Sequence, residues 1–416
     1  MRHSLLFVFT AAMAAAQPLT LESALEIAAK QNPGIQVTRL RLLERQAQSA
    51  STRANYLPQA ELNVSTAYQT NNLQGIGLAF PGISDRIGPY RTFNARPVLT
   101  QKVLDLSLLS AIRASRLQAA AAKLDIEAAR EETQAAVISL FLQTFQAQSR
   151  LRATQARLRN ADALLAQVSE REKAGASSQL DVARNRQQRE TEQLALIHAE
   201  QDLAQLRPAL SELLGGAPVA ELSEPKLSSS LATPTGSRPD VRAAAERVKA
   251  AEQELQRIRR ERWPGLTAQA DYGVLGAGPD RSTATYNVGA TLQVPLWTSG
   301  RLEADIRAAG HRLEQAKEEQ RRLELAAARL AAQAQIVHDS QTRAAQSAAQ
   351  SAAAARQVLE LARLRYESGM ATAVDTVTAQ SALAEAEDAE IRARYESSLA
   401  LARLAFARGD VQAVLR

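Results

Sequence analysis

Residues 284–294 read ATYNVGATLQV, and every second side chain in this stretch is apolar. A period of two is typical of a β-strand with one apolar and one polar face. The apolar face carries Tyr286, Val288 and Leu292. A helical pattern then runs without interruption from about residue 300 to 368. The stretch therefore predicts a two-faced strand that leads almost directly into a very long helix.

Three other stretches alternate in the same way and complete two strand pairs, at about 60–69, 92–104 and 266–274. The apolar face of the first of them carries Leu62 and Val64. Pro97 lies inside the second. Because proline has no N–H to donate to a ladder, we expect a bulge or a local break at that position.

Each strand pair is followed by a long helix, a glycine turn and a return helix. The helices are expected at about 107–173 and 178–214 in the first half of the chain and at 300–368 and 372–408 in the second. Gly175 and Gly369 supply the turns. At roughly 1.5 Å per residue the long helices extend for about 100 Å. Their narrow apolar seams and mostly polar surfaces favour a helical cylinder that is wet inside and out.

The chain repeats this plan twice. Trp263-Pro264 repeats Leu57-Pro58 at a distance of 206 residues (58 to 264), and the same order of strands and helices follows each of these dipeptides. A repeat of this length indicates duplication of a whole architecture. We expect a first repeat at 17–214 with its strand pair at about 58–104, a linker at 215–237, and a second repeat at 238–416 with its strand pair at about 264–296.

Residues 1–16 have the three zones of a secretory signal peptide. Arg2 precedes an apolar run from residue 5 to 9, and small residues end the segment at Ala16. We expect cleavage after Ala16 and export from the cytoplasm. The alternative is a short buried helix at the start of a cytoplasmic protein.

Composition excludes several classes of function. The chain has no cysteine, so it has no disulfide, thiolate metal site or cysteine nucleophile. Its net charge of +6 comes from basic and acidic residues interleaved along helices, a pattern of solvated faces rather than of nucleic-acid binding. After the signal segment no stretch has the eighteen or so apolar residues of a spanning helix, so membrane entry is expected through the strands.

Four strands from one chain leave two open edges, and unpaired backbone groups cost several kcal/mol each in a bilayer. Joining chains edge to edge into a closed barrel removes those edges. The face toward lipid would then carry the large apolar strand residues Leu62, Val64, Tyr286, Val288 and Leu292.

Several motifs in order resemble the TolC-type outer-membrane factors: LTLESAL at 19–25 with Asn32-Pro33, VPLW at 294–297 before Ser299-Gly300-Arg301, and YESG at 366–369 ahead of Asp375. The resemblance implies a mainly α fold with membrane β structure and an internal duplication. In that family three chains form a twelve-stranded transmembrane β-barrel, with four strands per chain, on a long periplasmic α-helical barrel.

The resemblance also implies a function. Such a homotrimer sits in the outer membrane, extends into the periplasm, and is the passive exit duct of a tripartite efflux or type I secretion system. An inner-membrane pump of RND or ABC type feeds it through a periplasmic adaptor, and it carries no cofactor.

In such proteins the return turns form the periplasmic tip, here the turns at Gly175 and Gly369. Asp181 with Tyr366 matches a carboxylate and a tyrosine that tie helix pairs together, and Asp375 matches an aspartate at the constriction. Three copies of Asp375 would form an anionic ring. The equally weighted alternative is that each aspartate caps the first turn of its return helix.

The alternative to a channel is a soluble periplasmic coiled-coil adaptor or scaffold, which would also have long helical hairpins. The alternating strands distinguish the two, because a scaffold needs no apolar face on them. The chain offers no phosphate loop or nucleophile motif, and His198, His311 and His338 lack a second histidine at ligand spacing, so we expect neither an enzyme nor a metal site.

Overall fold

The computed structural model describes residues 18–73, 75, 77, 86–228, 237–368, 370 and 372–415. The expected signal peptide at 1–16 and the expected tip turn at Gly369 lie outside the described residues.

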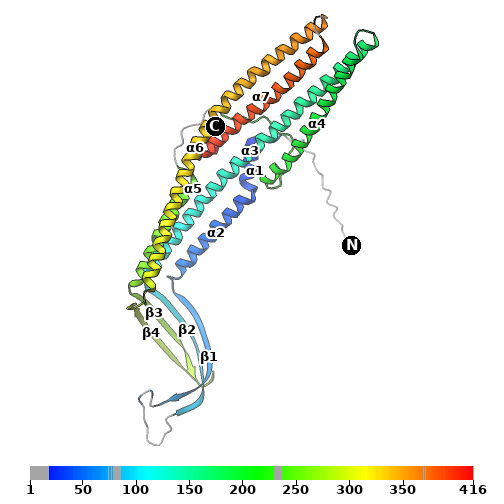
Figure 1. Ribbon diagram of the computed structural model, residues 1–416. Helices are drawn as coiled ribbons and strands as arrows, with labels where there is room; N and C mark the ends of the chain where they lie inside the picture. Colours follow the sequence, from blue (N-terminus) through cyan, green and yellow to red (C-terminus); the bar gives the residue numbers. More distant parts are fainter. Residues whose placement is uncertain are drawn as a thin grey trace, which may run out of the picture. The chain divides into compact units, whose positions relative to one another are not determined.

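The secondary structure consists of long helices and one set of strands (Figure 1). The helices are α1 (Leu21–Gln31), α2 (Pro33–Ala54), α3 (Leu106–Lys173), α4 (Gln179–Leu213), α5 (Pro239–Arg259), α6 (Arg301–Glu367) and α7 (Ala373–Arg408), with short 3-10 segments η2 (Arg260–Arg262) and η3 (Val411–Leu415). The strands are β1 (Gln59–Asn72), β2 (Arg86–Leu104), β3 (Gly265–Gly276) and β4 (Ser282–Gln293). The predicted long and return helices are confirmed to within one residue at each end.

The chain divides into two compact units. The sheet unit comprises Leu40–Leu124 and Arg242–Arg322, and it contains the strands β1 to β4. The helical unit comprises the described residues up to Arg39, together with Asp125–Val241 and Leu323–Arg416. It contains α4, α7 and the C-terminal parts of α3 and α6. Among the described helices, none is both long enough and apolar enough to cross a bilayer.

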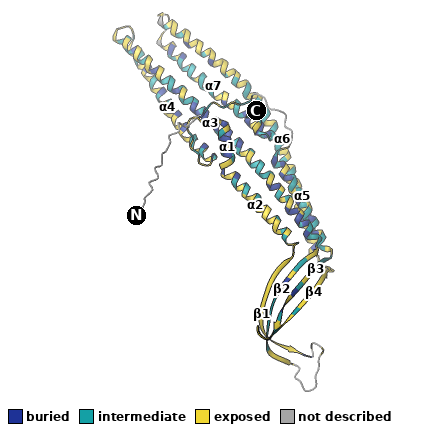
Figure 2. Ribbon diagram, turned by 180° about the vertical axis from the view of Figure 1, so that it is seen from behind, coloured by how far each residue is buried: buried dark blue, intermediate teal, exposed yellow. Residues whose placement is uncertain are grey.

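The strands form one antiparallel sheet in the order β1-β2-β3-β4. β1 and β4 are its edges, and each has a single neighbour among the described strands. β1 is exposed along its whole length, whereas β2 and β3 are partly covered (Figure 2). β2 starts at Arg86, six residues before the predicted start, because the chain continues to pair with β1 as far as Asn72.

Of the two outcomes expected at Pro97, the bulge is wrong, and the local break occurs on the side that faces β3. β2 keeps one register across this position, since Leu62 pairs with Pro97 and Asn63 pairs with Arg96. On the other side of β2 no partners are assigned at Arg96 and Pro97, yet the register with β3 is the same before and after them. In this register β3 has a glycine, Gly273, opposite Arg96. A Cβ on Gly273 would lie 2.3 Å from the Cβ of Arg96, so the two strands approach too closely for any side chain.

The register gives the sheet one apolar face. Leu99 pairs with Ala60 on β1 and with Ala270 on β3, and Ala270 pairs with Val288 on β4. Paired residues point to the same side, and side chains two apart along a strand share a face. The predicted apolar residues therefore all lie on one face, where they are 60% to 76% exposed: Leu62, Val64, Tyr286, Val288 and Leu292.

Each unit has its own apolar core. In the sheet unit, Leu255 and Ile258 of α5 pack with Leu302, Ala309 and Leu313 of α6. In the helical unit, the buried apolar side chains of α3 between Val137 and Phe145 pack against α1, α4 and α7. The ring of Phe145 meets that of Tyr395 edge on, with 5.5 Å between the ring centroids. This core fixes the return helices beside α3 and so positions the helical turns beyond it.

Candidate functional site

The turn between α3 and α4 is built on one left-handed glycine. Gly175 has φ +71°, a conformation that glycine adopts without strain. The N–H of Ala176 donates to the carbonyl of Arg171 at 2.8 Å, and that of Gly175 donates to Glu172 at 2.9 Å. These bonds satisfy the last carbonyls of α3 and reverse the chain within a few residues.

Asp181 caps the start of α4. The Ser178 hydroxyl accepts the Asp181 N–H at 3.1 Å, while the Asp181 carboxylate accepts the Ser178 hydroxyl at 2.7 Å and its N–H at 3.3 Å. This reciprocal pair is a capping box. The hydrogen bond from the Ser178 hydroxyl lowers the pKa of Asp181, and Arg184 adds to the effect.

Asp375 has the same role at the start of α7. Its carboxylate accepts the N–H and the hydroxyl of Thr372, both at 2.8 Å, and its own N–H donates to the Thr372 hydroxyl at 3.4 Å. The backbone hydrogen bond from Thr372 is the main reason that the pKa of Asp375 is lowered. The structure thus shows the capping role for both aspartates, and a role at a gate stays a prediction.

Tyr366, in the last turn of α6, meets α3. The guanidinium of Arg171 lies over its ring, 5.5 Å from the centroid, a distance at which a cation is attracted to an aromatic face. Within the described residues, the Asp181 side chain interacts with Ser177, Ser178 and Arg184, and a bond to Tyr366 is not among these contacts. Arg171 was not identified in the sequence analysis. Its position in the last turn of a helix is a common one for basic residues, which interact there with the last carbonyl groups.

A buried ion network joins the two hairpins further along α3. Arg157 pairs with Glu192 of α4, 3.2 Å from Nε to Oε2, and with Asp388 of α7, 3.0 Å from Nη1 to Oδ1. It also donates to the hydroxyl of Thr154 at 3.0 Å, and Gln188 donates to Glu192 at 2.9 Å. All five groups are wholly or partly buried. Sequence reasoning missed this network, because its members lie far apart along the chain among many other charged helix residues.

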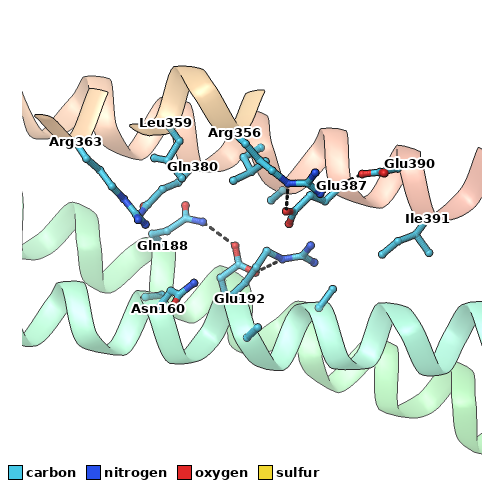
Figure 3. Close-up of a pocket in the computed structure, with 16 residues that line it drawn as sticks. Asn160, Gln188, Glu192, Arg356, Leu359, Arg363, Gln380, Glu387, Glu390 and Ile391 are labelled. Carbon is cyan, nitrogen blue, oxygen red and sulfur yellow. Dashed lines mark hydrogen bonds and ion pairs between the residues drawn. The ribbon is translucent and has the colours of Figure 1, made fainter. Parts of the chain in front are cut away.

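A cavity of about 380 Å³ surrounds the network, with residues of α3, α4, α6 and α7 in its lining (Figure 3). Arg356 of α6 lines it as well and pairs with Glu387 and Glu390 of α7, at 3.3 and 3.1 Å. Across the described residues, no group of three or more histidine, aspartate or glutamate side chains could hold a metal ion. In the helical unit, Arg157 thus makes an ionic contact between the two hairpins, and Arg356 makes ionic contacts within one of them.

Two segments of the chain, residues 24–216 and 235–410, match the sequence profile of one family, described as outer membrane efflux protein. The chain belongs to this family. It is therefore an efflux protein of the outer membrane, and the alternative of a soluble adaptor or scaffold does not hold.

Relatives of this outer membrane efflux protein include two export proteins. The pyoverdine export outer membrane protein OpmQ of Pseudomonas putida is 27% identical over 398 residues, which cover 92% of this chain and 84% of the relative. OpmQ of Pseudomonas aeruginosa is 28% identical over 283 residues, which cover 64% of this chain and 59% of the relative.

Solved structures show the same fold. The Campylobacter jejuni CmeC outer membrane channel has a TM-score of 0.81 at 17% identity, over 94% of this chain and 85% of that one. The outer membrane protein VceC of Vibrio cholerae has a TM-score of 0.80 at 21% identity, over 94% and 96%. The predicted fold of long helices with a four-stranded antiparallel sheet is thereby confirmed.

Proposed function

We propose that three copies of this chain join their sheets edge to edge into a twelve-stranded barrel in the outer membrane. The observation that carries the proposal is a four-stranded sheet whose two edge strands each have one neighbour among the described strands, and which has one exposed apolar face. In a bilayer the apolar face gains contact with lipid, while the edges must be paired. A closed trimer meets both requirements, with β1 of one copy against β4 of the next.

The assembled trimer would be a passive duct. An inner-membrane pump of RND or ABC type would supply the transport energy, and a periplasmic adaptor would connect it to the helical end. The names of the OpmQ relatives favour export of small molecules over secretion of proteins. The two internal repeats, at 17–214 and 238–416, would each contribute one strand pair and one helical hairpin to the wall.

The turns at Gly175 and Gly369 would form the periplasmic entrance. There, Tyr366 and Asp181 would hold hairpins together in the closed state, and the Asp375 carboxylates of three copies would face one another. Support comes from the contact of Tyr366 with Arg171, which already links α6 to α3 near these turns. The capping bonds of Asp181 and Asp375 use only part of each carboxylate, so a second partner remains open to both.

Barrel closure can be tested by crosslinking, since the chain has no cysteine of its own. One cysteine on β1, for example at Ser65, is combined in turn with one on β4 at positions 283 to 291. We expect at least one pair to give covalent dimers and trimers on a denaturing gel. If every pair yields only monomers while the protein remains in the outer membrane, the proposed closure is wrong.

The entrance is tested by single-channel conductance in planar bilayers. Tyr366→Phe and Asp181→Ala are expected to raise conductance, while Asp202→Ala, which removes an exposed pair with Arg150 inside one hairpin, should not. Unchanged conductance in both test variants would remove the assigned gate.

A further inference from the structure

The cavity around Arg157 has a neighbour that extends toward the helical turns. This second cavity, of about 260 Å³, is lined by residues of α3, α6 and α7, including Gln167 and Tyr366. Asn160, Arg363 and Gln380 line both cavities. The two hollows are therefore neighbours that share these three side chains, and together they occupy the space between the hairpins.

Charge is distributed unequally along this space. The first cavity is lined by three arginines and three glutamates. Each glutamate has an arginine partner, since Glu192 pairs with Arg157 and both Glu387 and Glu390 pair with Arg356. Arg363 is the exception: within the part of the chain that the structure describes, no carboxylate lies within ion-pair distance of it. Of the described residues, it is also the only charged one that lines the second cavity.

A second observation places an unused polar group beside Arg363. Thr376 lines the same cavity and is only 5% exposed, yet among the described residues its hydroxyl has no hydrogen-bond partner. A buried hydroxyl without a partner costs free energy that a bound acceptor would recover. Figure 3 shows the Arg363 side chain extending from α6 toward Gln188 of α4, whose amide bonds to Glu192, with Gln380 near Arg363.

The other part of the space is apolar. The lining of the first cavity includes small and branched apolar side chains from three helices: Ala153, Ala156, Ala161, Leu359, Leu383, Ala384 and Ile391. Such a surface accepts a flat or branched hydrocarbon body, and polar groups at one end fix its orientation.

We propose that the two neighbouring cavities together bind an amphipathic organic anion. Its carboxylate or sulfonate would pair with the Arg363 guanidinium and accept the hydroxyl of Thr376, and its apolar body would lie on the alanine and leucine surface around Arg157. The site lies within one chain and does not depend on the proposed barrel or gate. Because Tyr366 lines the second cavity, an occupant would also contact a residue of the proposed entrance.

The test measures binding and not transport. The full chain in lipid nanodiscs is titrated with dansylglycine, a fluorescent carboxylate, and the signal of empty nanodiscs is subtracted. We expect saturable binding that Arg363→Gln weakens about tenfold or more, because the substitution removes a charge-assisted hydrogen bond to the anion. Arg343→Gln, on the same helix but in the lining of neither cavity, should bind as the unchanged protein does.

Two further arms keep the outcome unambiguous. Dansylglycinamide, which lacks the charge, should bind about tenfold more weakly or worse. Ala384→Phe, which fills the apolar part, should abolish saturable binding even if Arg363→Gln fails to assemble. No saturable binding, equal affinity of the two arginine variants, or equal affinity for the amide would each overturn the proposal. Channel conductance would be unaffected by these failures, so the proposed function is judged separately.

Discussion

The guanidinium of Arg157 on α3 and the carboxylate of Asp388 on α7 are 3.0 Å apart, between Nη1 and Oδ1, and this contact ties one helical hairpin to the other. The Arg157 side chain is only 14% exposed. A second carboxylate, that of Glu192, completes its surroundings. Two acids on one buried arginine leave an excess of negative charge if that arginine is removed.

We expect Arg157→Met to destabilise the helical unit by about 3 to 5 kcal/mol, since it leaves one buried and one partly buried carboxylate without their cation. The control is Arg189→Met, which breaks exposed pairs with Asp162 and Glu190 and should cost less than about 1 kcal/mol. Thermal unfolding of the detergent-solubilised protein measures both. Equal losses in the two variants would show that the buried network is no more important than a surface pair.

Two glycines of the sheet provide a matched test of strand approach. A Cβ on Gly273 of β3 would lie 2.3 Å from the Cβ of Arg96 and 2.4 Å from the carbonyl oxygen of Ala95, whereas one on Gly289 of β4 meets nothing within 4 Å. Gly273→Ala should therefore cost about 1 to 3 kcal/mol through overpacking and reduce the amount of assembled protein. Gly289→Ala should leave the yield and the melting temperature of the assembly close to those of the unchanged protein. A larger loss of assembled protein in Gly289→Ala than in Gly273→Ala would refute the close approach of β2 and β3.

Adjacent residues on β4 test which face meets lipid. Val288 is 73% exposed on the apolar face, and Asn287 points to the other side, where it pairs with Asp271. Val288→Arg should cost about 2 to 4 kcal/mol if the position lies near the middle of the bilayer. Asn287→Arg should cost much less, because its face is polar. Recovery of folded protein in the outer-membrane fraction measures the difference, and equal recovery would contradict the lipid-facing assignment.

The two aspartate caps give a pH dependence with a fixed sign. Both carboxylates have a folded-state pKa below the ordinary value of 3.8, so their capping contribution is complete above that pH and is lost as the pH falls through the lowered folded-state pKa. We expect the first turns of α4 and α7 to lose hydrogen-exchange protection as the pH falls below about 4, after correction for intrinsic rates.

The first turn of α1 is the internal control for this measurement. Its capping box joins Thr20 to Ser23 and contains no carboxylate, so its protection should not change in the same way. In Asp181→Asn the turn of α4 should lose its pH dependence. A loss of protection that is equal at all three helices would indicate general acid unfolding instead of titration of the caps.

Local patterns in the sequence were sufficient for the elements. Apolar residues at a period of two indicate a strand with one apolar side, and this pattern alone placed the four strands. The helical patterns run without interruption until a glycine turn, and this alone placed the ends of the long helices. The helix-capping role of Asp181 and Asp375 could also be predicted from the sequence, because the capping partner of each lies three residues before it.

Longer-range contacts could not be read in the same way. Pro97 predicted a local break, and pairing with β3 is interrupted there, but the sequence could not show that the register is the same on both sides. Nor could it show that Gly273, 176 positions away (97 to 273), lies on the adjacent strand in close approach to Arg96. Arg171 over Tyr366 is a pairing of the same kind.

Sequence alone determined the type, order and faces of the elements, because these depend on neighbours within a few residues and on periodic burial. Only the tertiary structure decided which of many helix charges are buried and paired, and that Arg363 and Thr376 have no such partner among the described residues beside one cavity. The physical reason is that every arginine on a polar helix looks alike until packing removes water from some of them and brings acids from other helices within reach.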